Sequence, residues 1–162
     1  MRANRAMTSI LNAGPRAAKT FVPSRFRRLV EGGFKEVQGC TFYRDLFHAD
    51  QLSDSLFEIV MDKTGYECSV NHIHLEEYCQ KGAIRDVQSL ALISVQCASF
   101  LADSLRKKYP DDSFKILVSV RDEDRTCTMR FHKERRGEPW IDDDLEHYKE
   151  EAVFVMDTSK EP

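Results

Sequence analysis

The longest regular pattern of apolar residues runs from Asp86 to Tyr109. Apolar side chains recur there at spacings of three and four residues, the period of one face of an α-helix. The residues of this face are Val87, Leu90, Ile93, Cys97, Leu101 and Leu105. Asp86 at the start and three basic residues in the last turn suit the helix dipole, and Pro110 ends the pattern. The sequence therefore predicts a long buried helix with Leu101 at its centre.

Before this helix, two segments alternate between apolar and polar residues. Residues 56–61 and 66–72 flank a short turn at residues 62–65 that ends in a glycine, which predicts a β-hairpin. Residues 74–80 are compatible with a short helical turn. The pattern of residues 34–47 fits either a strand or a short helix, and both remain open.

A second hairpin is predicted after the helix. Residues 114–121 and 127–132 alternate around a charged turn, and residues 152–156 form a last apolar strand. Strands joined by short turns pair antiparallel. We therefore predict an α+β fold, in which two hairpins flank one long central helix in sequence and the helix packs on the antiparallel sheet.

Residues 1–33 show no steady apolar period and contain turn-forming glycine and proline pairs. They predict a disordered basic tail, of which residues 1–31 are dispensable for folding, followed by a single acidic α+β domain at residues 34–162. An arginine-rich segment without acids is also the composition of a mitochondrial transit peptide. A transit peptide, a flexible basic arm and a true start further downstream are therefore alternatives.

The charge of the chain is unevenly distributed. Seven of the 24 basic residues and none of the 27 acidic residues lie within residues 1–30, so the rest of the chain carries a formal charge of about −10 although the whole carries −3. Such a field attracts basic proteins and repels nucleic acids and anionic membranes. We expect a basic protein partner, no nucleic acid and no membrane, and keep a homodimer as an alternative assembly.

The cysteine content indicates a reducing compartment. The five cysteines are odd in number and scattered among apolar neighbours, and the sequence has no export signal. No apolar run reaches the roughly 18 residues that a membrane-spanning helix needs. We expect reduced thiols in a cytoplasmic protein, or a mitochondrial one if the N-terminal segment is a transit peptide.

The densest group of potential metal ligands is His72, His74 and Glu76. On a strand, the two histidines would point to the same face, as two ligands of one metal ion must. The chain has no CxxC pair, no HExxH helix and no glycine-rich phosphate-binding loop. A small metal-dependent hydrolase using this cluster is therefore the alternative function, and the first expectation is a protein without cofactor.

The segment around the only tryptophan is the candidate binding surface. Trp140 is followed by the acidic residues Asp142, Asp143, Asp144 and Glu146. Clustered carboxylates attract a cationic surface, and a tryptophan beside them can anchor a desolvated contact; the same ring could instead cover the edge of the sheet. The sequence thus predicts a non-enzymatic acidic interaction module, for example an immunity- or antitoxin-type inhibitor of a basic enzyme.

Overall fold

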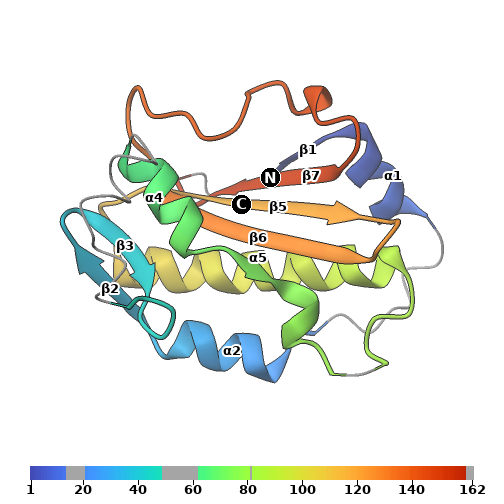
Figure 1. The fold of residues 1–162 in the computed structure, drawn as a ribbon, viewed down its shortest axis with the longest axis horizontal. Coiled ribbons are helices and arrows are strands. Elements are labelled where there is room, and N and C mark those ends of the chain that lie inside the picture. Colours follow the sequence, from blue (N-terminus) through green and yellow to red (C-terminus); the bar gives the residue numbers. More distant parts are fainter. Residues whose placement is uncertain (14–20, 49–61, 81, 160–162) are drawn as a thin grey trace.

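The computed structural model describes residues 1–13, 21–48, 62–80 and 82–159. Its centre is an antiparallel five-stranded sheet (Figure 1). In spatial order its strands are β1 (Arg2–Ala3), β7 (Ala152–Asp157), β5 (Phe114–Arg121), β6 (Thr126–Lys133) and β4 (Ile73–His74). The predicted second hairpin is β5 and β6, and the predicted last strand is β7. The α+β class, with an antiparallel sheet and a long helix on it, is confirmed.

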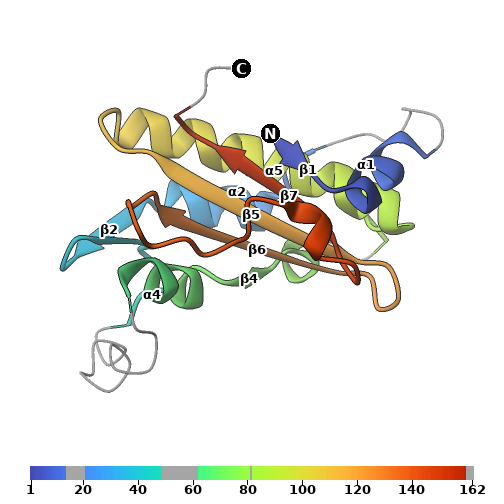
Figure 2. The same cartoon turned by 90° about the horizontal axis from the view of Figure 1, so that it is seen from above.

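The long helix α5 (Val87–Lys108) covers one face of the sheet (Figure 2). Its first turn is held by a capping box, in which the Asp86 side chain accepts from the Ser89 backbone N–H at 2.7 Å and Ser89 Oγ accepts from the Asp86 N–H. Leu101 is fully buried between this helix and the sheet core, as predicted. Within the described part of the chain, no helix is long and apolar enough to cross a membrane.

Leu101→Ala is expected to lower the free energy of unfolding by about 2 to 5 kcal/mol, because it removes buried apolar area and leaves a cavity. Urea denaturation measures this change. Gln96→Ala, at an exposed position of the same helix, is the matched control and should change the free energy of unfolding by less than about 0.5 kcal/mol. An unchanged midpoint for Leu101→Ala would contradict its place in the core.

The first hairpin lies earlier in the chain than predicted. Strands β2 (Phe34–Val37) and β3 (Cys40–Tyr43) pair around Gln38 and Gly39, both with positive φ. Residues 66–72, predicted as a strand, instead lie mostly in helix α4 (Lys63–Val70), and residues 56–61 lie outside the described residues. The Asp62 side chain caps α4 by accepting from Gly65 N at 2.6 Å. The predicted helical turn near residue 75 is the 3₁₀ helix η2 (Leu75–Tyr78).

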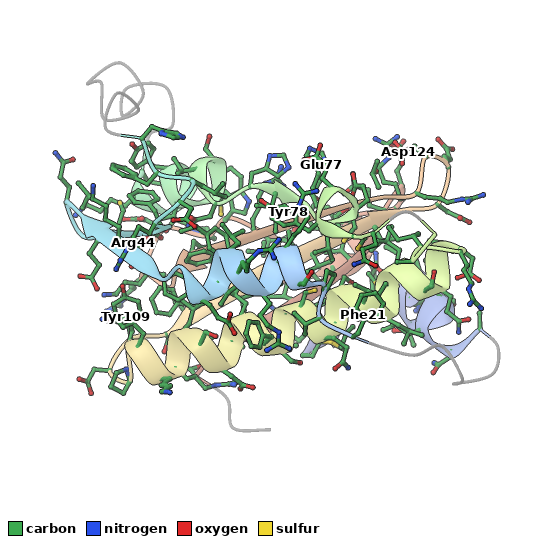
Figure 3. All side chains as sticks on the ribbon, turned by 90° about the horizontal axis from the view of Figure 1, so that it is seen from below. Phe21, Arg44, Glu77, Tyr78, Tyr109 and Asp124 are labelled. Carbon is green, nitrogen blue, oxygen red and sulfur yellow. The ribbon has the colours of Figure 1, made fainter. Side chains whose placement is uncertain are left out.

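The prediction of a disordered N-terminal tail is wrong for the described residues. Strand β1 pairs with β7, and helix α1 (Arg5–Asn12) buries Met7 completely. Helix α2 (Ser24–Glu31) buries Phe26, Leu29 and Val30, and Figure 3 shows Tyr78 of η2 beside it. The rings of Phe26 and Tyr78 lie edge to face, 6.2 Å apart. The domain therefore includes this segment, because tertiary packing stabilises two helices too short to form alone.

Candidate functional site

A long connection crosses the face of the sheet opposite α5, which we call the outer face (Figure 2). The connection, here called the strap, comprises residues 134–151 between β6 and β7 and includes the 3₁₀ helix η3 (Leu145–His147). Apolar side chains join it to the outer face in a small second core. The core residues are Leu117, Val153 and Val155 of the sheet and Leu145 of the strap, with Ile141 and Tyr148 packed against them.

Two cavities lie between the strap and the outer face, and both are lined by Trp140 and Ile141. The first, the Arg130 chamber, has a volume of about 180 Å³. It is lined by Leu117, Val118, Ser119, Thr128, Arg130, Trp140, Ile141, Tyr148, Glu151 and Val153. The second, the His132 chamber, has a volume of about 260 Å³, and five of its ten lining residues are charged. Trp140 borders both cavities, and because it is 43% exposed it also faces solvent.

The strap begins at a buried ion pair with α4. The Glu67 carboxylate is fully buried and accepts from both terminal nitrogens of Arg135, at 2.7 and 2.9 Å. The same carboxylate accepts the backbone N–H of Thr41 at 2.6 Å and of Lys133 at 2.8 Å. Glu67 therefore joins β3, β6 and the strap, because its two oxygens take all four hydrogen bonds.

Asn71 continues this bridge one helical turn further along. Its side chain accepts from Tyr43 N at 3.1 Å and donates to the carbonyls of Thr41 at 2.9 Å and Phe131 at 3.1 Å. Strands β3 and β6 belong to different sheets and do not pair with each other. The Asn71 side chain therefore satisfies backbone groups of both strands that strand pairing would otherwise satisfy. The bridge fixes the position at which the strap starts.

The His132 chamber has its charges mostly paired. Lys115 Nζ lies 3.1 Å from a carboxylate oxygen of Glu134. His132 is buried, and its Nδ1 lies 2.9 Å from the Lys133 carbonyl oxygen, which can only accept; Nδ1 therefore carries a proton. Burial lowers the pKa of His132, so the ring is neutral at pH 7. Its Nε2 has no hydrogen-bond partner among the described residues.

The predicted acidic residues lie on the strap, and most of them also hold the fold together. Asp142 accepts from His147 at 2.7 Å, and this pairing raises the pKa of His147. The pKa of Asp142 is lowered, first by the N–H of Asp144 and then by His147. Asp143 lies 3.6 Å from Arg2, and Glu146 accepts the backbone N–H of Arg5 at 2.9 Å. The strap is thus joined to the N-terminal segment.

The predicted metal group is only partly assembled. The rings of His72 and His74 are 4.9 Å apart, and His74 Nδ1 lies 3.4 Å from one oxygen of Glu76. The other oxygen of Glu76 accepts the Cys127 N–H at 2.9 Å. In the described ranges of the chain, no three His, Cys, Asp or Glu side chains are placed to hold a metal ion. Glu76 serves as an anchor between η2 and β6.

The cysteines are unpaired, and their surroundings disfavour thiolate chemistry. Burial raises the pKa of Cys40 and of Cys79 to about 11, and raises those of Cys68, Cys97 and Cys127 as well. A thiol is a nucleophile or metal ligand in its deprotonated form. At neutral pH these side chains are therefore neutral parts of the interior.

The residues that sequence reasoning missed are those that line the Arg130 chamber besides Trp140. Arg130 is half-buried, and its guanidinium forms no hydrogen bond or ion pair within the described parts of the chain. Ser119 Oγ donates to Glu151 Oε2 at 2.5 Å. The alternation of β6 placed Thr128, Arg130 and His132 on one face, but the sequence did not show that the strap would cover that face.

Comparison with known proteins identifies the family. The sequence profile of the Uncharacterized protein PM0498 family matches residues 2–161. The chain is similar to Uncharacterized protein PM0498 of Pasteurella multocida (strain Pm70), with 28% identity over 114 residues. That match covers 65% of this chain and 66% of the relative, slightly less than two thirds of the relative's length. No solved structure matches the chain. Because the profile match spans nearly every residue, the chain belongs to the Uncharacterized protein PM0498 family.

Proposed function

We propose that the protein is a non-enzymatic interaction module whose strap binds a basic protein partner. The observation that carries this proposal is the position of Trp140, 43% exposed on the strap. Residues 138–151, which include it, contain seven carboxylates and one lysine. An exposed tryptophan beside clustered charge is the combination that supplies both an anchor and electrostatic attraction to a partner of opposite charge.

The acidic residues keep their charge accessible although several of them bond within the fold. The side chain of Asp143 is 94% exposed and that of Asp144 is 60% exposed. The electrostatic part of the proposal rests on this local density of charge, because the charge of about −10 counted residues 31–162 alone. The described N-terminal arginines belong to the domain, so they contribute to its field.

The finer proposal is an immunity- or antitoxin-type inhibitor that blocks a basic enzyme in the cytoplasm. Strand β1 and helix α1 support the cytoplasmic setting over a cleaved mitochondrial leader, because cleavage would remove the buried Met7 of α1 and uncover the edge of β7. The hydrolase alternative has no comparable support. Glu76 uses one of its oxygens on the Cys127 backbone, and the two histidines lack a third ligand among the described residues.

Trp140→Ala is expected to weaken partner binding by about 2 kcal/mol, roughly 30-fold, mainly by faster dissociation. Changing Asp142, Asp143 and Asp144 together to Asn should instead lower the association rate about tenfold at low salt and flatten its salt dependence. The partner is first captured by co-purification with the wild-type protein. Binding kinetics at two salt concentrations then separate the two effects.

The matched control removes three exposed acids outside the strap, as Asp111→Asn, Asp122→Asn and Glu123→Gln. Two of them lie in the turn between β5 and β6, which Asp124 marks in Figure 3. This control should leave both rate constants near those of the wild type. Folded Trp140→Ala and triple Asn variants that bind as the wild type does would refute the proposed surface. Unfolding of Trp140→Ala would show that the ring is a cover for the core.

A further inference from the structure

The Arg130 chamber contains one cation and one anion that do not pair with each other. Arg130 and Glu151 are the only ionisable residues of opposite sign that line it, and no ion pair joins them within 4 Å. The Arg130 guanidinium forms no hydrogen bond or ion pair in the described parts of the chain, although its charge helps to lower the pKa of His72 beside β4. Glu151 accepts one hydroxyl, from Ser119, through Oε2. Two half-buried opposite charges are therefore left with unused hydrogen-bonding capacity across one small space.

The strand register explains why the two charges are held apart. Ser119 of β5 lies opposite Thr128 of β6 on one side and Val153 of β7 on the other. Arg130 lies two residues beyond Thr128, and Glu151 lies two residues before Val153, so both point to the outer face. The guanidinium is thus held on β6 and the carboxylate on the last residue of the strap before β7, with the Ser119 hydroxyl on β5 between them.

Most of the other lining residues of the chamber are apolar, and Thr128 and Tyr148 add a hydroxyl group each. Leu117 and Val153 belong to its sheet side, and Trp140 and Ile141 belong to the strap. The volume of about 180 Å³ is below the roughly 300 to 1,000 Å³ of pockets for drug-sized ligands. The chamber therefore suits a molecule of a few heavy atoms that carries both charges and a short apolar group.

We propose that the Arg130 chamber binds a small zwitterion of the α-amino acid class with a short aliphatic side chain. The ligand carboxylate contacts the Arg130 guanidinium, whose planar fork of N–H donors matches a carboxylate. The ligand ammonium contacts Glu151, which has an oxygen available besides the one that Ser119 uses. The aliphatic side chain lies against the apolar wall. This site shares Trp140 with the proposed partner surface, but it needs no second protein.

The test uses Trp140, the only tryptophan of the chain, as a reporter inside the chamber wall. L-Valine is titrated into the full-length protein and followed by tryptophan fluorescence and by calorimetry. N-Acetyl-L-valine removes the positive charge of the ligand, and L-valine amide removes the negative one. We expect saturable binding of L-valine and about tenfold or more weaker binding of each analogue, because hydrogen bonds between charged groups are the strong ones.

Two variants assign the charges. Arg130→Gln should remove the preference for L-valine over L-valine amide, and Glu151→Gln should remove the preference over N-acetyl-L-valine. Glutamine keeps a hydrogen-bonding oxygen for Ser119, so the Glu151 variant should fold as the wild type does. The matched controls are Arg121→Gln, at the exposed end of β5, and Glu150→Gln, at an exposed position just before β7. Both should preserve both preferences.

Three results would overturn the proposal. The first is no calorimetric or fluorescence response to L-valine in the folded wild type. The second is equal affinity for L-valine and both analogues, which would show that neither charge is recognised. The third is unchanged selectivity in both folded variants, which would place the bound ligand outside the Arg130 chamber. None of these measurements includes the basic protein partner. A negative result here therefore does not test the proposal that the strap binds such a partner.

Discussion

Glu67→Ala is expected to lower the free energy of unfolding by about 3 to 5 kcal/mol, which would be the largest effect of any single substitution outside the apolar core. The change removes a fully buried carboxylate and leaves the Arg135 guanidinium without its ion pair. It also leaves the N–H groups of Thr41 and Lys133 without their acceptor. Urea denaturation of the wild type and the variant measures the difference.

The matched control is an exposed ion pair, Arg27 with Glu31 in α2, whose charged atoms are 3.8 Å apart. Glu31→Ala should cost no more than about 0.5 kcal/mol, because solvent screens exposed pairs. Glu67→Gln should fall between the two, since an amide can still accept one of the backbone bonds. A Glu67→Ala variant as stable as Glu31→Ala would show that Glu67 does not join the strap, β3 and β6.

Deleting residues 1–13 is expected to destabilise the protein by about 3 kcal/mol or more. The deletion exposes the site of the fully buried Met7, whose loss alone is comparable to a large-to-small core substitution. It also removes β1 from the edge of β7. At roughly 2 to 4 °C per kcal/mol for a chain of this size, the melting temperature should fall by about 10 °C. Thermal unfolding followed by circular dichroism measures it.

Asn4→Ala measures how much the hydrogen bonds of residues 1–13 contribute to the free energy of unfolding, apart from the burial of their apolar side chains. The buried Asn4 side chain accepts from Met7 N and Val153 N, both at 3.0 Å, and donates to the carbonyls of Tyr148 and Glu151. Removing it leaves these groups unsatisfied, so about 2 kcal/mol should be lost. Ser9→Ala, at an exposed position of α1, should be neutral. A deletion of residues 1–13 with an unchanged melting temperature would restore the prediction of a dispensable tail.

The sequence predicted the parts of the fold whose pattern is long and one-sided. Helix α5 repeats its apolar face over six turns, and β5 and β6 each bury alternate residues, so local periodicity was sufficient there. Helices α1 and α2 carry the same spacing for one turn only. Phe26, Leu29 and Val30 are an example. Such a short pattern does not stand out from chance, and its stability comes from packing on residues far along the chain.

Helix α4 was misassigned because it is buried on most of its surface. Five consecutive residues, from Thr64 to Cys68, are buried, so no polar face reveals the helical period. The alternation of Tyr66, Cys68 and Val70 then imitates a strand. Sequence reasoning also found Trp140 and its acidic neighbours but not their partners. Arg2 and Arg5 form hydrogen bonds with strap residues that lie 141 positions further along the chain, and a local sequence pattern cannot predict such contacts.

The pairing of the first strand with the last has a consequence for synthesis. Strand β7 lies between β1 and β5, with Arg2 opposite Val155, so the sheet is completed only when β7 has been made. At about 5 to 20 residues per second, β1 waits several seconds on the ribosome with its edge unpaired. The sheet therefore acquires its full stability only after β7 has been made, and the contacts between β1 and β7 contribute to a high contact order and slow folding.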